Sequence, residues 1–184
     1  MKKIFISAGH SNQPNKDCGA VGNGFVEGVL AAELRTLIAA KLQNIYGIIP
    51  VMDDDSNVLL DTIRKFRNMT APDSIVIDIH FNASANAEAT GTEVLIPGAP
   101  SDTEKKLASY IAFVTAEIIG IKNRGVKSEL ESHHGRLGWM RLTGENILIE
   151  VCFITNAKDM KHYNDYKNTL AAKYAEVISG FARA

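Results

Sequence analysis

The stretch SIVIDIH, residues 74–80, is a short apolar run that ends on an imidazole. A second run of the same kind, NILIEV, covers residues 146–151 and carries a glutamate as its next-to-last residue. Near-continuous apolar runs of this length are typical of strands that are covered on both faces, as in parallel sheets. These two runs therefore predict the centre of an α/β sheet.

Short apolar runs alternate with helical patterns along the rest of the chain, which is typical of an α/β protein. A length of 184 residues suits one domain with a sizeable core and is short for two, so we expect residues 1–184 to form a single domain. The expected strands are residues 3–8, 48–52, 74–80, 92–96, 138–141 and 146–151. Apolar residues at helical spacing indicate four helices, with Ser56 expected to cap the second and the sequence SDTE at 101–104 expected to form a capping box for the third.

The composition excludes several classes of protein. The formal net charge is −1, so no basic field attracts nucleic acid or anionic membrane, and we expect neither as a partner. No apolar run approaches the roughly 20 residues that a membrane span needs, so we expect no membrane insertion. The two cysteines, Cys18 and Cys152, form no disulfide framework or metal motif, and we expect two unpaired thiols.

Ionisable side chains follow or end three of the expected strands. His10 comes two residues after the first strand, His80 ends the third, and Glu150 lies near the end of the last. In an open α/β sheet the ligand crevice lies outside the carboxyl ends of the strands, so parallel strands would bring these three groups to one edge. Glu27 is carried back to that edge by the glycine-rich loop after His10.

These residue types fit a catalytic zinc site. Zinc accepts imidazole nitrogen and carboxylate oxygen, and a catalytic zinc keeps three protein ligands and one open position. We expect His10, Glu27 and His80 to be the ligands, which leaves Glu150 to move a proton between water and a leaving amine. Spacing alone leaves an alternative open, because a lone histidine at a strand end is often just hydrogen-bonded.

Four segments of the chain resemble the zinc-dependent N-acetylmuramoyl-L-alanine amidases of the type 3 family, found in cell-wall hydrolases and phage endolysins. They are SAGH with His10, DCGAVGNGFVE with Glu27, DIHFNA with His80, and NILIEVCFITNAKD with Glu150; the sequence RGVK at 124–127 also fits. The resemblance implies a twisted, mostly parallel sheet of about six strands with helices on both faces. It also implies zinc as cofactor, Glu150 as general base and then general acid, and hydrolysis of the amide between N-acetylmuramic acid and L-alanine of peptidoglycan.

Substrate contacts are harder to assign from the sequence. Asn82 either positions substrate or only holds its loop, and Asp78 is either a hydrogen-bond acceptor for a ligand imidazole or a solvated polar residue. Trp139 could stack on a sugar ring, and Arg141 could bind a carboxylate of the stem peptide in bidentate fashion. Alternatively, each is an ordinary core or surface residue. His133 and His134 either grip substrate or a second metal, or are solvated loop residues. Glu93 and Glu104 are expected to be solvated or capping residues.

Two other functions remain open: another zinc amide hydrolase of the carboxypeptidase or aminopeptidase kind, and a catalytically inactive peptidoglycan-binding module. The apolar run at residues 4–8 is too short for a signal-peptide core of about 7–15 residues. We therefore expect either a monomeric protein that stays in the cytoplasm until it is released, as a phage endolysin does, or the trimmed catalytic domain of a secreted hydrolase.

Overall fold

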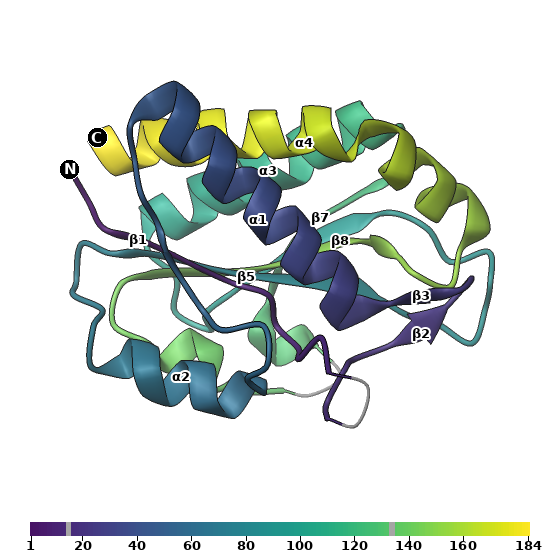
Figure 1. Cartoon of the computed structure of the whole chain (residues 1–184), viewed down its shortest axis with the longest axis horizontal. Helices are drawn as coiled ribbons and strands as arrows, with labels where there is room; N and C mark the ends of the chain where they lie inside the picture. The colour runs from purple at the N-terminus through teal and green to yellow at the C-terminus, as the bar shows by residue number, and fades with distance from the viewer. Residues whose placement is uncertain (14–15, 133–134) are drawn as a thin grey trace.

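A six-stranded sheet in the order β4-β1-β5-β8-β6-β7 forms the centre of the protein. The computed structural model describes residues 1–13, 16–132 and 135–184 (Figure 1). The strands are β1 Ile4–Ser7, β4 Val51–Met52, β5 Ile75–Asn82, β6 Thr92–Ile96, β7 Asn123–Ser128 and β8 Glu145–Phe153, and a separate hairpin pairs β2 Val21–Gly22 with β3 Phe25–Val26. The helices are α1 Glu27–Tyr46, α2 Leu59–Arg67, α3 Asp102–Ile119 and α4 Ala157–Arg183, with short 3-10 helices at Glu129–Glu131 and Trp139–Arg141.

The sheet is parallel except at one junction. Strands β4, β1, β5 and β8 run in the same direction, and β6 pairs antiparallel with β8 while β7 runs parallel to β6. The predicted single α/β domain with a mostly parallel sheet is therefore confirmed. The amino end of β6 lies beside the carboxyl end of β8, where Glu93 stands opposite Glu150.

The two faces of the sheet carry different layers. Helices α1, α3 and α4 cover one face, and α2 with the short 3-10 segments lies on the other (Figure 1). The larger core lies under the three helices and includes Ile77, Ile79 and Phe81 of β5. A smaller core under α2 contains Phe66, Trp139 and their apolar neighbours. Helices thus cover both faces, as expected, but unequally.

Local signals explain where α3 and α4 begin. Ser101 and Glu104 form the predicted capping box of α3, so Glu104 is the capping residue that the sequence indicated. Asn156 caps α4 by accepting from the N–H groups of Lys158 and Asp159. The expected cap at Ser56 is wrong, because α2 begins after Val58 without a side-chain cap and Ser56 instead donates to Asp54.

Several elements differ from the sequence prediction, including the β2–β3 hairpin, which lies in the glycine-rich loop between His10 and Glu27. The expected strand at residues 138–141 is a 3-10 helix, in which Trp139 is packed into the smaller core at 1% exposure. Strand β7 was not predicted as a strand, because an edge strand of polar, partly exposed residues shows little apolar periodicity. In the part of the chain that the structure describes, no helix has both the length and the apolar character to span a membrane.

Candidate metal centre

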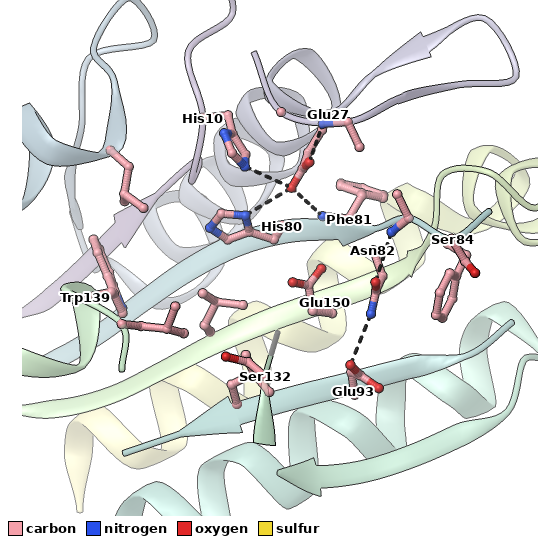
Figure 2. Close-up of a pocket in the computed structure, with 18 of the residues that line it drawn as sticks. His10, Glu27, His80, Phe81, Asn82, Ser84, Glu93, Ser132, Trp139 and Glu150 are labelled. Atoms are coloured by element: carbon pink, nitrogen blue, oxygen red, sulfur yellow. Dashed lines mark hydrogen bonds and ion pairs between the residues drawn. The ribbon is translucent and has the colours of Figure 1, made fainter. Parts of the chain in front are cut away.

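Three of the predicted residues converge at the carboxyl edge of the parallel strands (Figure 2). One ligand atom each from His10, Glu27 and His80 lies within 4.8 Å of the others. Glu27 Oε1 is central, at 3.0 Å from His80 Nδ1 and 3.5 Å from His10 Nε2. Two imidazole nitrogens and one carboxylate oxygen are the donor set of a zinc site that keeps one position open. The residues present therefore fit the metal that the sequence indicated.

Each of the three residues is delivered by a different element. His10 follows β1 in a turn whose backbone is fixed by Asp78, which accepts from the N–H of Gly9 at 2.9 Å. His80 is the sixth residue of β5, and Glu27 is the first residue of α1. The β2–β3 hairpin leads directly into Glu27, and its turn residue Asn23 donates to the carbonyl of Ile154 at 2.9 Å. The hairpin is thereby tied to the end of β8.

Backbone donors hold the Glu27 carboxylate in place. Oε2 accepts from the N–H of Ala20 at 2.8 Å, and Oε1 accepts from the N–H of Phe81 at 3.1 Å. Gly19 has a φ of +73° and lies against the cluster, where a Cβ would stand 2.5 Å from Glu27 Oε2 and 2.7 Å from His10 Cδ2. Only glycine satisfies both the backbone conformation and the close approach at this position.

Each imidazole has a carboxylate on its outer nitrogen. His80 Nε2 lies 3.0 Å from Asp78 Oδ2, and His10 Nδ1 lies 3.0 Å from Asp17 Oδ1. Carboxylates in this position fix the ring orientation and tautomer of a metal-binding histidine. The first contact is the one proposed for Asp78 from the sequence, although its effect on metal affinity stays a prediction. The second was missed, because an exposed aspartate in a polar loop has no distinguishing signal.

The cluster is electrostatically coupled. Burial opposes ionisation of Glu27, but the hydrogen bond and charge of His80, the charge of His10 and the Ala20 N–H outweigh it and lower the pKa of Glu27. Burial also opposes protonation of His80, yet Asp78 and Glu27 raise its pKa well above the ordinary value. The carboxylates around His80 therefore favour positive charge at this place, and a bound cation would take the place of the proton on the imidazole.

Glu150 lies beside the cluster on the neighbouring strand. It pairs in register with His80 on one side and with Glu93 on the other, so these three side chains form a row on one face of the sheet. Its Oε2 is buried and has no hydrogen-bond partner among the described residues. Burial, with smaller contributions from Glu27, Glu93 and Asp78, raises the pKa of Glu150 to about 7, although His80 opposes the shift. A carboxyl with this pKa can both accept and return a proton near neutral pH.

Glu93 is part of the site, and the expectation that it is a solvated or capping residue is wrong. It is 9% exposed and faces the pocket, where Asn82 Nδ2 donates to its Oε1 at 3.1 Å. Arg124 and Lys127 of β7 each contact its Oε2 at 2.6 Å. Glu93 lies near the amino end of its strand, where a rule based on the carboxyl ends of parallel strands does not find it; β6 is antiparallel to β8 and brings its amino end to this edge.

A cavity of about 860 Å³ surrounds the row and has two unlike ends. Figure 2 shows Trp139 on one side of Glu150, with Asn82 and Glu93 on the other. The Trp139 end includes the apolar side chains of Leu59, Leu95, Leu137 and Leu148, which belong to or pack against the smaller core, whereas the Glu93 end is polar. Trp139 therefore belongs to the core and also forms part of the cavity wall.

The remaining predicted residues lie at different distances from this cavity. Asn82 lines the cavity, but both polar atoms of its side chain already have partners. Its Nδ2 donates to Glu93, and its Oδ1 accepts from the N–H of Ala83. Arg141 is not among the cavity-lining residues described and lies 3.6 Å from Glu129. Substrate binding by either residue stays a prediction. His133 and His134, for which a metal or substrate contact was considered, lie outside the described residues.

The cysteines match the expectation of two free thiols. Alternation along β8 would place Cys152 on the same face as Glu150. The register shifts between His80 and Asn82 on the partner strand, so Val151 and Cys152 both enter the larger core. This β-bulge removes Cys152 from the pocket, and the side chain lies 4.0 Å from Met160 instead.

Comparison with known proteins agrees with this geometry. The model of a family described as N-acetylmuramoyl-L-alanine amidase matches residues 4–180. No curated protein matches the sequence.

Several solved structures share the fold. An N-acetylmuramoyl-L-alanine amidase from Clostridium difficile 630 superposes with a TM-score of 0.81 at 23% identity, covering 100% of this chain and 97% of that one. A protein from Neisseria meningitidis, described as a candidate N-acetylmuramoyl-L-alanine amidase, gives 0.79 at 29% identity, with 97% and 94% covered. The catalytic domain of the endolysin CD27L, which targets Clostridia difficile, gives 0.74 at 21% identity, with 97% of both chains covered.

Proposed function

The chain belongs to the N-acetylmuramoyl-L-alanine amidase family, and from this premise we propose that it is a zinc-dependent peptidoglycan hydrolase whose ligands are His10, Glu27 and His80. The bond that it cuts is the amide between N-acetylmuramic acid and the L-alanine of the stem peptide. One observation carries the proposal: three donor atoms from three separate elements lie within 4.8 Å of one another, beside a buried carboxyl on the next strand. We further propose that residues 1–184 form one catalytic domain.

The metal-binding residues support this chemistry through their charge and position. Bound zinc would supply a Lewis acid that polarises the amide carbonyl and acidifies water. His10 and His80 contribute imidazole nitrogens, and Glu27 contributes an oxygen that two backbone N–H groups already orient. Asp17 and Asp78 hold the outer ring nitrogens, which keeps the inner nitrogens directed at Glu27.

Glu150 is the proposed proton carrier. Its unpartnered Oε2 faces no competing donor among the described residues, so it is available to accept a proton from water. The same carboxyl can then donate that proton to the amine of L-alanine as the C–N bond breaks. A pKa of about 7 suits both directions of transfer near neutral pH.

The proposal is tested by pairing zinc content with product analysis. We expect elemental analysis to find one zinc per chain, and purified peptidoglycan to release new alanine amino termini, with a chelator abolishing the release and added zinc restoring it. A His80→Ala variant should lose both metal and activity. His162→Ala is a matched control, because His162 lies on α4 against the carbonyl of Ile119, away from the cluster.

Each other outcome points to a different function. Zinc without new alanine amino termini would retain the metal site but indicate a peptidase with another target. Folded protein that neither holds zinc nor releases alanine after reconstitution would indicate a peptidoglycan-binding module without catalysis.

A further inference from the structure

A pair of cations closes the polar end of the cavity. Arg124 Nε and Lys127 Nζ both lie 2.6 Å from Glu93 Oε2, and their side chains are 32% and 31% exposed. Two cations against one carboxylate leave a net positive charge at this point. Arg124 lines the cavity and Lys127 is not among its described lining residues, so Arg124 is the cation that a ligand in the cavity would meet.

Three contacts position the Arg124 side chain. Its stem packs against Gly91, where a Cβ would stand 2.9 Å from Arg124 Cγ, and its guanidinium lies 5.1 Å from the ring centroid of Phe153. Its Nε is occupied by Glu93. Nη1 and Nη2 have no hydrogen-bond partner within residues 1–13, 16–132 and 135–184. The two terminal nitrogens therefore form a preorganised fork, which is the geometry that binds a carboxylate in bidentate fashion.

The fork lies at a defined distance from the proposed reaction centre. Glu150 is on β8, Glu93 is its partner on β6, and Arg124 comes from β7, the next strand. Two strand spacings correspond to about 10 Å. An extended peptide advances roughly 3.3–3.6 Å per residue, so this distance corresponds to about three residues beyond the bond that is cut.

Charge distinguishes the two halves of the substrate. Muramic acid whose carboxyl is in amide linkage carries no charge, whereas a stem peptide carries free carboxylates. Apart from the proposed metal ligands, Glu150 and Glu93, the charged side chains that line the described cavity are Arg124 and Glu131, and Glu131 Oε2 accepts from the N–H of Ser128. A fixed cation is therefore complementary to the peptide half.

We propose that Arg124 binds a carboxylate of the stem peptide within about three residues of the hydrolysed bond, with Glu93, Lys127 and Phe153 as its positioning residues. This makes Arg124 a specificity determinant, and the inference rests on the proposed amidase function. Two carboxylates of a stem peptide have this chemistry: the free α-carboxyl of a side-chain-linked glutamate at the second position, and the carboxyl at the end of a short peptide.

A set of four synthetic muramyl tripeptides separates these sources. Each has a side-chain-linked glutamate at the second position; the α-carboxyl of that residue and the terminal carboxyl are each either free or amidated. We would measure kcat/KM for release of alanine amino termini by the wild type, Arg124→Gln, Arg124→Lys, Arg141→Gln and, as a surface control, Arg64→Gln. Arg64 is exposed on α2 and pairs only with Asp61 among the described residues.

The wild type should cut the substrate with the recognised carboxylate about 10- to 100-fold faster than its amidated form. Arg124→Gln should remove this preference, because only hydrolysis of the substrate with the free carboxylate should become slower. Arg124→Lys should restore part of the preference. The amidated substrate is the internal control, since structural damage would slow both forms alike. No preference in the wild type, or a preference that Arg141→Gln abolishes and Arg124→Gln does not, would overturn the proposal.

Binding measurements keep this test independent of hydrolysis. Calorimetric titration of the same four compounds into Glu150→Gln protein should give tighter binding of the acid form, lost on adding Arg124→Gln. Such binding without hydrolysis by the wild type would support the subsite and refute the amidase function. Hydrolysis with equal affinity and equal kcat/KM for all four compounds would refute the subsite alone.

Discussion

Alternate residues of β5 face opposite sides of the sheet and have different roles, core packing on one side and the candidate site on the other. Ile77, Ile79 and Phe81 are buried under α1, α3 and α4, whereas Asp78 and His80 lie on the face of the candidate metal centre, to which His80 belongs. Both sets are almost completely buried, so exposure does not distinguish them. What differs is the partner: apolar side chains on one face, and charged or hydrogen-bonding groups on the other. Stability and chemistry are therefore carried by neighbouring residues and should be separable by mutation.

The largest loss of activity without loss of stability is expected at Glu150. Replacing Glu150 by Gln keeps the shape but removes the proton carrier, so kcat should fall by roughly 10²- to 10⁴-fold while the fold persists. Initial rates on purified peptidoglycan and circular dichroism would measure the two effects. Ile149→Val is the matched control, since Ile149 is adjacent in β8 but packs in the helix-covered core. A Glu150→Gln protein that degrades peptidoglycan at the normal rate would refute the mechanism.

A loss of stability without a loss of activity is expected on the neighbouring strand β5, at a residue that faces the helices. Ile77→Ala leaves a cavity in a fully buried position and should lower the free energy of unfolding by about 2–5 kcal/mol. The kcat/KM of the molecules that remain folded should not change. Urea unfolding and activity measured at low temperature would check both statements. Loss of activity in fully folded Ile77→Ala protein would show that the two faces are not separable.

Asp78 and Asp17 compare a buried carboxylate with an exposed one in the same role. Asp78 is fully buried and also accepts from Gly9, so Asp78→Asn should weaken zinc affinity about 10- to 100-fold. Asp17 has a side chain that is 58% exposed, so water can replace it and Asp17→Asn should have a smaller effect. Competition with a chromophoric chelator would measure both. Unchanged affinity in Asp78→Asn would contradict the orienting role.

The smallest effect is a pH dependence of stability in protein from which a chelator has removed metal. Burial raises the pKa of Glu150 from 4.5 to about 7, so the folded state binds this proton more tightly than the unfolded chain does. Its stabilising contribution is complete below about pH 4.5 and is lost as the pH rises through about 7. Glu150→Gln has no such loss, so above pH 7 it should exceed the wild type by about 1–2 kcal/mol, allowing for partial solvent contact.

Denaturant unfolding of both proteins at several pH values would measure this difference. A constant difference between the two proteins from about pH 4.5 to about 8 would mean that Glu150 has an ordinary pKa in the stripped protein.

The central part of the candidate site could be predicted because it depends on patterns that are visible in the sequence. Apolar runs mark β5 and β8, parallel strands share one carboxyl edge, and His80 and Glu150 stand at the ends of those runs. The direction of β6 cannot be read in this way, since an apolar strand looks the same in either orientation. Glu93 was therefore misassigned, although a lone acid inside a buried strand is a usable signal.

The other errors have equally local causes. Arg124 lies on an edge strand whose polar residues show no clear period, and its proposed role depends on Gly91 and Phe153, which are distant in sequence. Alternation along β8 would place Cys152 beside Glu150, but a bulge, which adds one residue to the count and leaves no mark in the sequence, places it in the larger core. Trp139 and Arg141 were expected in a strand, but three residues are too few for periodicity to separate a strand from a 3-10 turn.

The strand order also determines when the sheet can be completed during translation. β8 is the last strand to be made, yet it lies between β5 and β6 in the middle of the sheet. A nascent chain that has not yet reached residue 145 lacks both Glu150 and β8, the strand that joins the two halves of the sheet. Under the proposed function, catalytic competence is therefore not acquired gradually during translation, because it requires β8. Fragments that end before β8 would lack the proposed proton carrier and should be inactive.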